Sequence, residues 1–156
     1  MDFVQTIKEI ISLNIAVDMG TCDTRICTSG GGTVLHEPSC IAVSAITGDV
    51  AAAGTEAQRM IGRCPPDIEI ARPLAQGVVV DFDLAELMLQ RFMRKVMRGR
   101  AMFGAHVVIT APAAATDVEI RAFGDIASHV GARQVDIVEA PVAAALGLGV
   151  VSGSHR

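Results

Sequence analysis

A short polar loop near the N-terminus has residue types that could hold an anion. Asp18 follows the largely apolar run 14–17, and residues 20–24 then read Gly-Thr-Cys-Asp-Thr. Successive backbone N–H groups in such a turn can converge on a phosphate. The same residues are also typical of an ordinary hairpin turn, because Gly and Asp favour turns. The pattern alone leaves both interpretations open.

The other residues that could do chemistry form no recognised arrangement. The cysteines include no CxxC pair and have no histidine at metal-ligand spacing, which argues against a zinc site and fits a reducing cytosol. No Ser/His/Asp or Cys/His pattern suggests a hydrolase, and we expect the histidines to be structural or solvated. The net charge of −4 argues against general nucleic-acid binding, which requires a basic surface.

The spacing of apolar residues predicts the elements that would position the loop. At 156 residues the chain can form one ordinary domain with a real core. The first third reads as short strands joined by glycine turns, and the last third alternates strand and helix, which implies a right-handed parallel crossover. We therefore expect an α/β fold with a mixed sheet. The expected strands are 14–19, 25–28, 33–35, 39–44, 50–53, 106–110 and 134–138, and the expected helices include 55–61, 83–98 and 141–148.

Local signals set the ends of two helices. Thr116 and Glu119 form a capping box for a further helix, and Gly131 stands where a helix-ending glycine is common. For the helix 55–61 we expect Thr55 to be the cap. The proline-punctuated segment 64–73 reads as a connection.

The N-terminal leader, residues 1–13, carries apolar residues at helical spacing, with Lys8 and Glu9 among them. We expect either a short helix that packs on the domain or a frayed leader. The alternative is an amphipathic helix that lies on a membrane surface. It lacks the basic start and cleavage site of a signal peptide, and no apolar run is long enough to span a bilayer.

Five sequence blocks resemble the MreB family of bacterial actins and follow the family's order. They are DMGTCDT, LHEPSCIAV, GTEAQRMIGRCPPDIEIARPLAQGVVVDF, VVITAPAAATDVEIRAF and EAPVAAALGLG. The resemblance implies the first half of an actin-like ATPase fold of the ribonuclease H-like type. It assigns subdomain IA to 14–33 and 74–150, a small inserted α/β subdomain IB to 34–73, and a tail to 151–156.

In this family the first hairpin loop presents backbone N–H groups to the phosphates of ATP. By resemblance, Asp18 holds Mg²⁺ through water, and the ATP-binding residues are Gly20, Thr21, Cys22, Asp23 and Thr24. The family's loop reads D-L-G-T-A-N-T, so Cys22 and Asp23 are departures. Asp23 adds a negative charge where the phosphates would approach, which weakens the expected binding.

The family's hydrolytic glutamate stands immediately before a proline, and here Ala140 occupies that position. A methyl group cannot orient or deprotonate water. Glu139 is one residue off and, at the end of a strand, points to the other side. The family's second phosphate loop, D-x-G-G-G-T, would follow Gly149 and does not occur in this sequence. We therefore expect a truncated family member that is not an efficient ATPase alone and whose exposed apolar surface favours self-association.

MreB proteins insert two adjacent apolar residues of subdomain IA into the inner membrane leaflet. The corresponding residues here are Met102 and Phe103. Flanking basic residues would be attracted to anionic lipids, and they are Arg94, Lys95, Arg98 and Arg100. The alternative is that both apolar side chains fold into the core and the basic residues form a solvated helix face.

Two functions follow from the resemblance. The first is a filament-forming cytoskeletal protein of cell shape, cytoplasmic and peripheral at the inner face of the cell membrane, with itself or full-length MreB filaments as partner. The second is a nucleotide-independent half-actin module that docks on MreB filaments or on the membrane as a modulator. The family blocks favour the first function. Ala140, Asp23 and the missing second loop favour the second.

Overall fold

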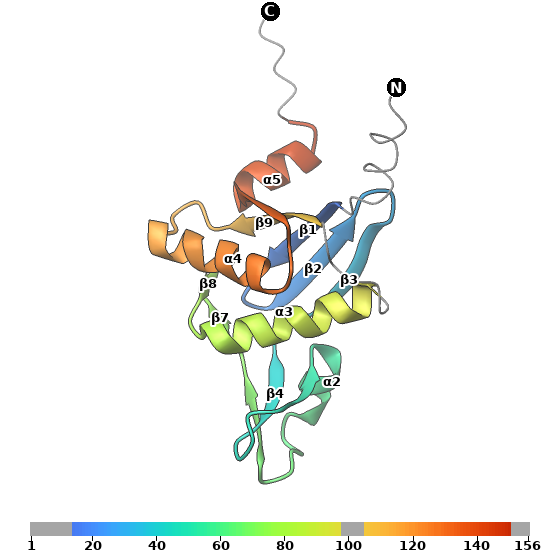
Figure 1. The fold of residues 1–156 in the computed structure, drawn as a ribbon, viewed down its shortest axis with the longest axis vertical. Coiled ribbons are helices and arrows are strands. Elements are labelled where there is room, and N and C mark those ends of the chain that lie inside the picture. The colour runs from blue at the N-terminus through green and yellow to red at the C-terminus, as the bar shows by residue number, and fades with distance from the viewer. Residues whose placement is uncertain (1–13, 98–104, 151–156) are drawn as a thin grey trace, which may run out of the picture.

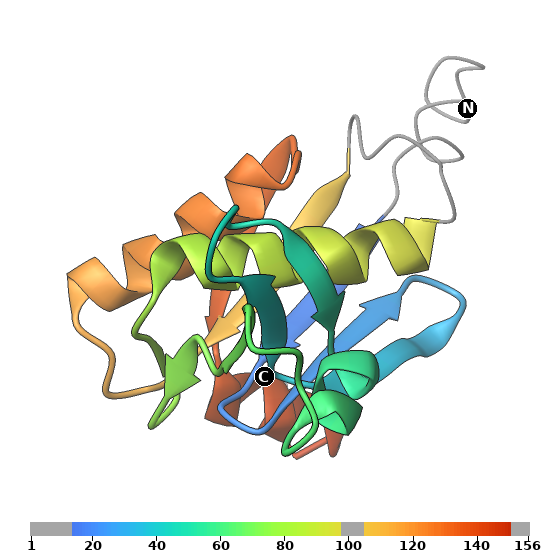
Figure 2. The ribbon, with the colours of Figure 1, turned by 90° about the horizontal axis from the view of Figure 1, so that it is seen from below.

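The larger sheet contains β1 (Asn14–Met19), β2 (Asp23–Thr28), β3 (Gly32–Pro38), β9 (His106–Ala111) and β10 (Gln134–Glu139). The computed structural model in Figures 1 and 2 describes residues 14–97 and 105–150. The strand order is β10-β9-β1-β2-β3. β10, β9 and β1 are parallel, whereas β1, β2 and β3 form an antiparallel meander. The predicted α/β fold with a mixed sheet is confirmed.

Two long helices, α3 (Phe82–Met97) and α4 (Asp117–His129), lie side by side and share one core with this sheet (Figures 1 and 2). β1 and β9 bury every second residue in that core. Successive side chains of a strand point to opposite faces. Asp18 and Thr110 fall between the buried positions, so they lie on the face of the sheet away from the two helices.

A smaller sheet lies on the other side of α3 from α4 (Figure 1). Its strands are β5 (Val50–Ala53), β4 (Ile41–Ser44) and β6 (Ile68–Ala71), in the antiparallel order β5-β4-β6. α2 (Thr55–Met60) packs on this sheet around Cys40, Ala42, Ala52 and Ala57. The expected subdomain boundary between residues 33 and 34 falls within β3, and the division into subdomains stays a prediction.

Two local predictions were wrong. The segment 64–73 contains β6, because its alternating isoleucines pair with β4 even though prolines flank the strand. Thr55 does not cap α2. The N-cap is Gly54, with φ of 67°, and the Thr55 N–H donates to Glu37 Oε2 at 3.0 Å. A carboxylate from a distant strand therefore replaces the local cap.

α4 begins and ends as predicted. The Thr116 side chain accepts a hydrogen bond from the Glu119 N–H, and the Glu119 carboxylate accepts one from the Thr116 N–H at 2.7 Å. This backbone hydrogen bond, and next the bond from the Thr116 hydroxyl, lower the pKa of Glu119. Gly131 follows the C-cap with φ of 105°. Adjacent residues therefore determine both ends of this helix.

Three predicted features lie outside the described residues. They are the leader 1–13, the tail 151–156 and the membrane-contacting pair Met102 and Phe103. Among the helices that the structure describes, none is long and apolar enough to cross a membrane.

Candidate functional site

The turn between β1 and β2 lies at the edge of the sheet where the parallel strands β1, β9 and β10 end. Ligands of α/β folds often bind at this edge. The Gly20 N–H donates to the Asp23 carbonyl at 3.0 Å, and a Cβ at Gly20 would lie 2.9 Å from that oxygen. The turn itself therefore requires glycine, and the Gly20 N–H is not available to a ligand.

Two other N–H groups of the turn remain available. Within 14–97 and 105–150, the amides of Thr21 and Cys22 have no hydrogen-bond acceptor. The Thr21 hydroxyl accepts a hydrogen bond from the Gly77 N–H at 2.7 Å, so its own hydrogen can still be donated. The turn thus offers two adjacent amides and one hydroxyl to an anion.

A small hairpin fixes the Thr21 side chain. It joins β7 (Leu74–Ala75) to β8 (Val78–Val79), and its central residues Gln76 and Gly77 have φ of 52° and 85°. Positive φ at both central residues is the mark of a type I′ turn, which aligns the flanking strands. The hairpin therefore presents the Gly77 N–H in a defined direction.

Ser39 supports the turn from the protein side. Its hydroxyl donates to the Gly20 carbonyl at 2.6 Å, and its N–H donates to the Cys22 carbonyl at 2.8 Å. The Thr24 hydroxyl lies 2.8 Å from Ser39 Oγ and acts as the donor, because the Ser39 hydrogen points to Gly20. Thr24 and Ser39 are both fully buried. The Thr24 side chain therefore braces the turn and does not face a ligand.

Asp18 lies between two neighbouring strands. The Thr110 hydroxyl on β9 donates to Asp18 Oδ1 at 2.7 Å, and Nη1 of Arg25 on β2 lies 3.4 Å from Oδ2. The Asp18 side chain is 45% exposed, so both oxygens retain lone pairs toward solvent. A single carboxylate of this kind fits a hydrated Mg²⁺. The described residues contain no group of three acidic, His or Cys side chains that could hold a dehydrated ion.

Asp23 and Cys22 lie on the outer side of the turn. Asp23 Oδ2 is 3.5 Å from Nε2 of His36 on β3, and both side chains are about half exposed. His36 compensates the carboxylate only while its imidazole is protonated. With a neutral imidazole, the turn carries an uncompensated negative charge beside its available amides.

Position 140 lies at the same edge of the sheet. β10 ends at Glu139, and α5 (Ala140–Gly147) begins at the next residue. Glu139 pairs in register with Ala111, the neighbour of Thr110. The Glu139 side chain makes no capping hydrogen bond and its residue is exposed. Ala140 therefore brings only a methyl group to the edge that also carries Asp18.

Sequence reasoning missed Ser39, Gly77 and Thr110 as parts of this site. Thr110 carried one local signal, a hydroxyl at the end of an apolar strand. Ser39 and Gly77 carried none, because the groups that they bind are 19 and 56 residues away.

Comparisons with known proteins agree with the fold. The MreB/Mbl protein family matches residues 12–153. The chain is 38% identical over 148 residues to the cell shape-determining protein MreB of Escherichia coli K12. The aligned region covers 92% of this chain and 43% of that protein.

Solved structures show the same relationship. MreB5 of Spiroplasma citri bound to ADP superposes with a TM-score of 0.79 at 32% identity, over 90% of this chain and 42% of that chain. The MamK double helical filament superposes with a TM-score of 0.74 at 22% identity, over 88% of this chain and 44% of that chain. This likeness supports the fold alone. The chain thus spans less than half the length of these proteins. With nearly its whole length matched, the chain belongs to the MreB/Mbl family.

Proposed function

We propose that this chain is a non-hydrolysing component of an MreB-type cell-shape cytoskeleton. It binds ATP with Mg²⁺ at the turn 20–24 and associates with copies of itself or with full-length MreB filaments at the inner face of the cell membrane. The observation that carries the proposal is the turn. Among the residues that the structure describes, the amides of Thr21 and Cys22 have no protein acceptor, while Ser39 bonds to the Gly20 and Cys22 carbonyls. The similar MreB5 structure is bound to ADP, and the similar MamK structure is a filament.

Different groups of the site would bind the phosphate and the metal ion. A terminal phosphate would accept hydrogen bonds from the two amides and from the Thr21 hydroxyl, an arrangement typical of backbone anion sites. Asp18 would hold the hydration shell of Mg²⁺, which neutralises phosphate charge. Thr110 and Arg25 keep the Asp18 carboxylate in place from both neighbouring strands.

Position 140 supports the absence of turnover. General-base catalysis requires a group within hydrogen-bond reach of the attacking water. Ala140 has no such group, and the exposed Glu139 precedes it as the last residue of β10. We therefore expect ATP to be bound without release of phosphate above background.

Asp23→Asn tests the nucleotide site. The change removes one charge near the phosphates and keeps the side chain's shape. We expect ATP–Mg²⁺ affinity to rise about fivefold, since two like charges about 4 Å apart in a water-like dielectric repel by roughly 1 kcal/mol. Calorimetric titration measures the affinity. Asp49→Asn, an exposed change in the turn before β5, is the matched control and should bind as the parent does. If neither protein binds millimolar ATP–Mg²⁺, the nucleotide part of the proposal is wrong.

Met102→Ala/Phe103→Ala tests membrane association. Burying two large apolar side chains in a lipid leaflet contributes a few kcal/mol, roughly 1.5–3 for each. We expect the double variant to lose most of its co-sedimentation with anionic liposomes. Ile46→Ala removes an exposed apolar side chain from the small sheet's turn and serves as the control. Unchanged sedimentation of the double variant would contradict the membrane assignment.

A nucleotide-independent module is the second candidate. It is favoured by the Asp18 carboxylate, which already has Arg25 as its charge partner, and by the charge of Asp23. The two candidates differ in a filament-binding assay with full-length MreB. Binding that persists after enzymatic removal of all nucleotide supports the module, whereas binding that requires ATP supports the first proposal.

A further inference from the structure

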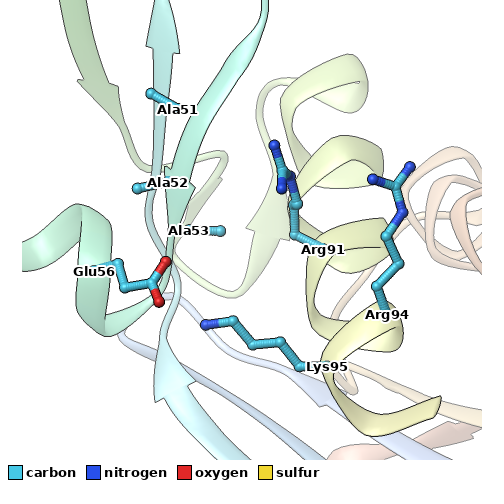
Figure 3. A pocket seen from close by; sticks show the side chains of 7 residues that line it. All are labelled: Ala51, Ala52, Ala53, Glu56, Arg91, Arg94 and Lys95. Atoms are coloured by element: carbon cyan, nitrogen blue, oxygen red, sulfur yellow. The ribbon is translucent and has the colours of Figure 1, made fainter. Parts of the chain in front are cut away.

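A groove with one strongly basic wall separates α3 from the small sheet. Its volume is about 260 Å³, and no residue of the turn 20–24 contributes to it. Figure 3 shows its two walls: β5 and the start of α2 on one side, and three cationic side chains of α3 on the other. The lining residues are Ala51, Ala52, Ala53, Glu56, Arg91, Arg94 and Lys95. A second hollow of about 130 Å³ shares Arg91 and Arg94 and extends the groove along α3.

The residue types on each wall keep the groove open and charged. On the β5 wall, Ala51, Ala52 and Ala53 line the groove, and their small side chains leave room beside the strand. Ala52 points the other way, into the core under α2. On α3 the cations stand at positions 91, 94 and 95. A spacing of three and four residues places side chains on one face of a helix. Figure 3 shows the Lys95 side chain reaching toward Glu56, whereas the guanidinium groups of Arg91 and Arg94 lie further along α3.

The charges in the groove are unequally compensated. Lys95 Nζ is 2.9 Å from Glu37 Oε1, and Glu56 lies on the wall opposite Lys95 (Figure 3). Arg91 Nη2 donates to the Val50 carbonyl at 2.6 Å, which is a neutral acceptor. Arg94 has no hydrogen-bond or ion-pair partner in the part of the chain that the structure describes.

The two arginines thus retain their charge and most of their donors. A guanidinium carries five N–H donors in a planar fork, and Arg91 uses one side of its fork for the carbonyl. That fork matches the oxygens of a phosphoryl group better than a lysine does. The groove is smaller than the usual pocket for a drug-sized ligand, roughly 300–1,000 Å³. It suits a phosphate-bearing head rather than a whole nucleotide.

We propose that this groove is a second anion site, which binds a phosphoryl group between Arg91 and Arg94. The Val50 carbonyl pre-orients Arg91, and Arg94 supplies the partner charge from the next helical turn. Lys95 stays with Glu37 and closes one end. The phosphoryl group can come from a soluble phosphorylated molecule or from an anionic lipid head group. Both present the same chemistry to the arginines.

Site-resolved titration separates this site from the turn 20–24. Inorganic pyrophosphate is added to the ¹⁵N-labelled full chain, and amide shifts are followed by NMR. We expect shifts at residues 50–53 and 91–95, and about tenfold weaker binding there in Arg94→Gln, since a charge-assisted hydrogen bond contributes that much. Arg121→Gln, an exposed change on α4, is the control. Shifts confined to 20–24, or unchanged affinity at 50–53 in Arg94→Gln, overturn the proposal.

Arg91→Gln guards against a purely structural effect. It should weaken pyrophosphate binding as Arg94→Gln does. The thermal unfolding of Arg94→Gln should match that of the parent, because Arg94 has no bonding partner among the described residues. Vesicles then identify the source. Sedimentation with phosphatidylglycerol vesicles that falls in Arg94→Gln and is competed by pyrophosphate supports a lipid head group. Pyrophosphate binding with vesicle sedimentation independent of Arg94 supports a soluble ligand.

Discussion

Ser39 shows how one buried hydroxyl can set the shape of a backbone turn. Its side chain and its N–H bind the carbonyls of Gly20 and Cys22. The Gly20 carbonyl points to Ser39, so the Thr21 N–H of the same trans peptide points the opposite way. Within the described residues, neither this amide nor that of Cys22 has a protein acceptor. Thr24 completes the arrangement by donating to the Ser39 oxygen. The available amides of the turn are therefore a consequence of groups buried behind it.

Ser39→Ala should destabilise the fold and loosen the turn. It leaves the buried Thr24 hydroxyl and the part-buried Gly20 carbonyl without these partners, which costs about 1–3 kcal/mol. Urea unfolding followed by circular dichroism measures the loss. Ser128→Ala removes an exposed hydroxyl from α4 and should change the free energy of unfolding by less than about 0.5 kcal/mol. Equal effects of the two substitutions would mean that Ser39 has no special role.

The site could be predicted in part because its main residues are adjacent in sequence. Asp18, Gly20 and Thr21 stand in one short stretch whose turn-forming residues are recognisable. Their supporting partners come from β3 and the β7–β8 hairpin, and nothing local links them to the turn. Thr24 illustrates the limit, because the family resemblance assigned it to ATP, whereas its side chain is buried and bonded to Ser39.

At the scale of elements, Glu37 links three parts of the fold. Its carboxylate accepts hydrogen bonds from Lys95 Nζ on α3, at 2.9 and 3.1 Å, and from the Thr55 N–H at the start of α2. It also lies against Gly54, whose φ is 67°. The end of β3 thus ties the small sheet to the large one. Ser39, two residues after Glu37, bonds to the turn 20–24 through its hydroxyl and its N–H.

Gly54→Ala should break this link. A Cβ there would overlap Glu37 Oε2 and approach Phe92 Cε1 within 2.9 Å, in addition to the strain of a positive φ. We expect a loss of about 2–4 kcal/mol in the free energy of unfolding, from overpacking and left-handed strain together. Gly48→Ala has a similar φ of 74° in open space and should lose only about 1–2 kcal/mol. Equal losses in the two proteins would exclude the clash with Glu37.

The elements differ in how well sequence predicts them, because some are stabilised by neighbouring residues and others by residues far away in the sequence. α4 has an apolar period of 3.6 and a capping box within its own residues, so both ends were predictable. β6, β7 and β8 have two to four residues each and depend on partners to be strands at all. The start of α2 depends on Glu37, 18 residues away from Thr55. Elements stabilised by tertiary partners leave little local signal.

At the scale of the whole molecule, the unusual feature is α5. The helix has no charged residue, yet none of its residues is buried. Figure 1 places it at the opposite end of the molecule from the small sheet. Val142, Leu146 and Leu148 are 45, 56 and 79% exposed. Contiguous exposed apolar surface of this kind marks an interaction site in soluble proteins.

Self-association through α5 is therefore the last prediction. Two copies that cover this helix remove apolar surface from water, and each fully buried Leu or Val contributes roughly 1.5–3 kcal/mol. We expect a concentration-dependent increase in the sedimentation coefficient of the parent chain, and a monomer for Val142→Ser/Leu146→Ser over the same concentrations. Ile46→Ser changes a side chain that is 81% exposed at the opposite end and should leave association intact. Association that survives the α5 substitutions but is lost with Ile46→Ser would move the interface to the small sheet. A monomeric parent at high concentration would contradict this prediction and would mean that the small side chains of α5 offer too little surface for a stable contact.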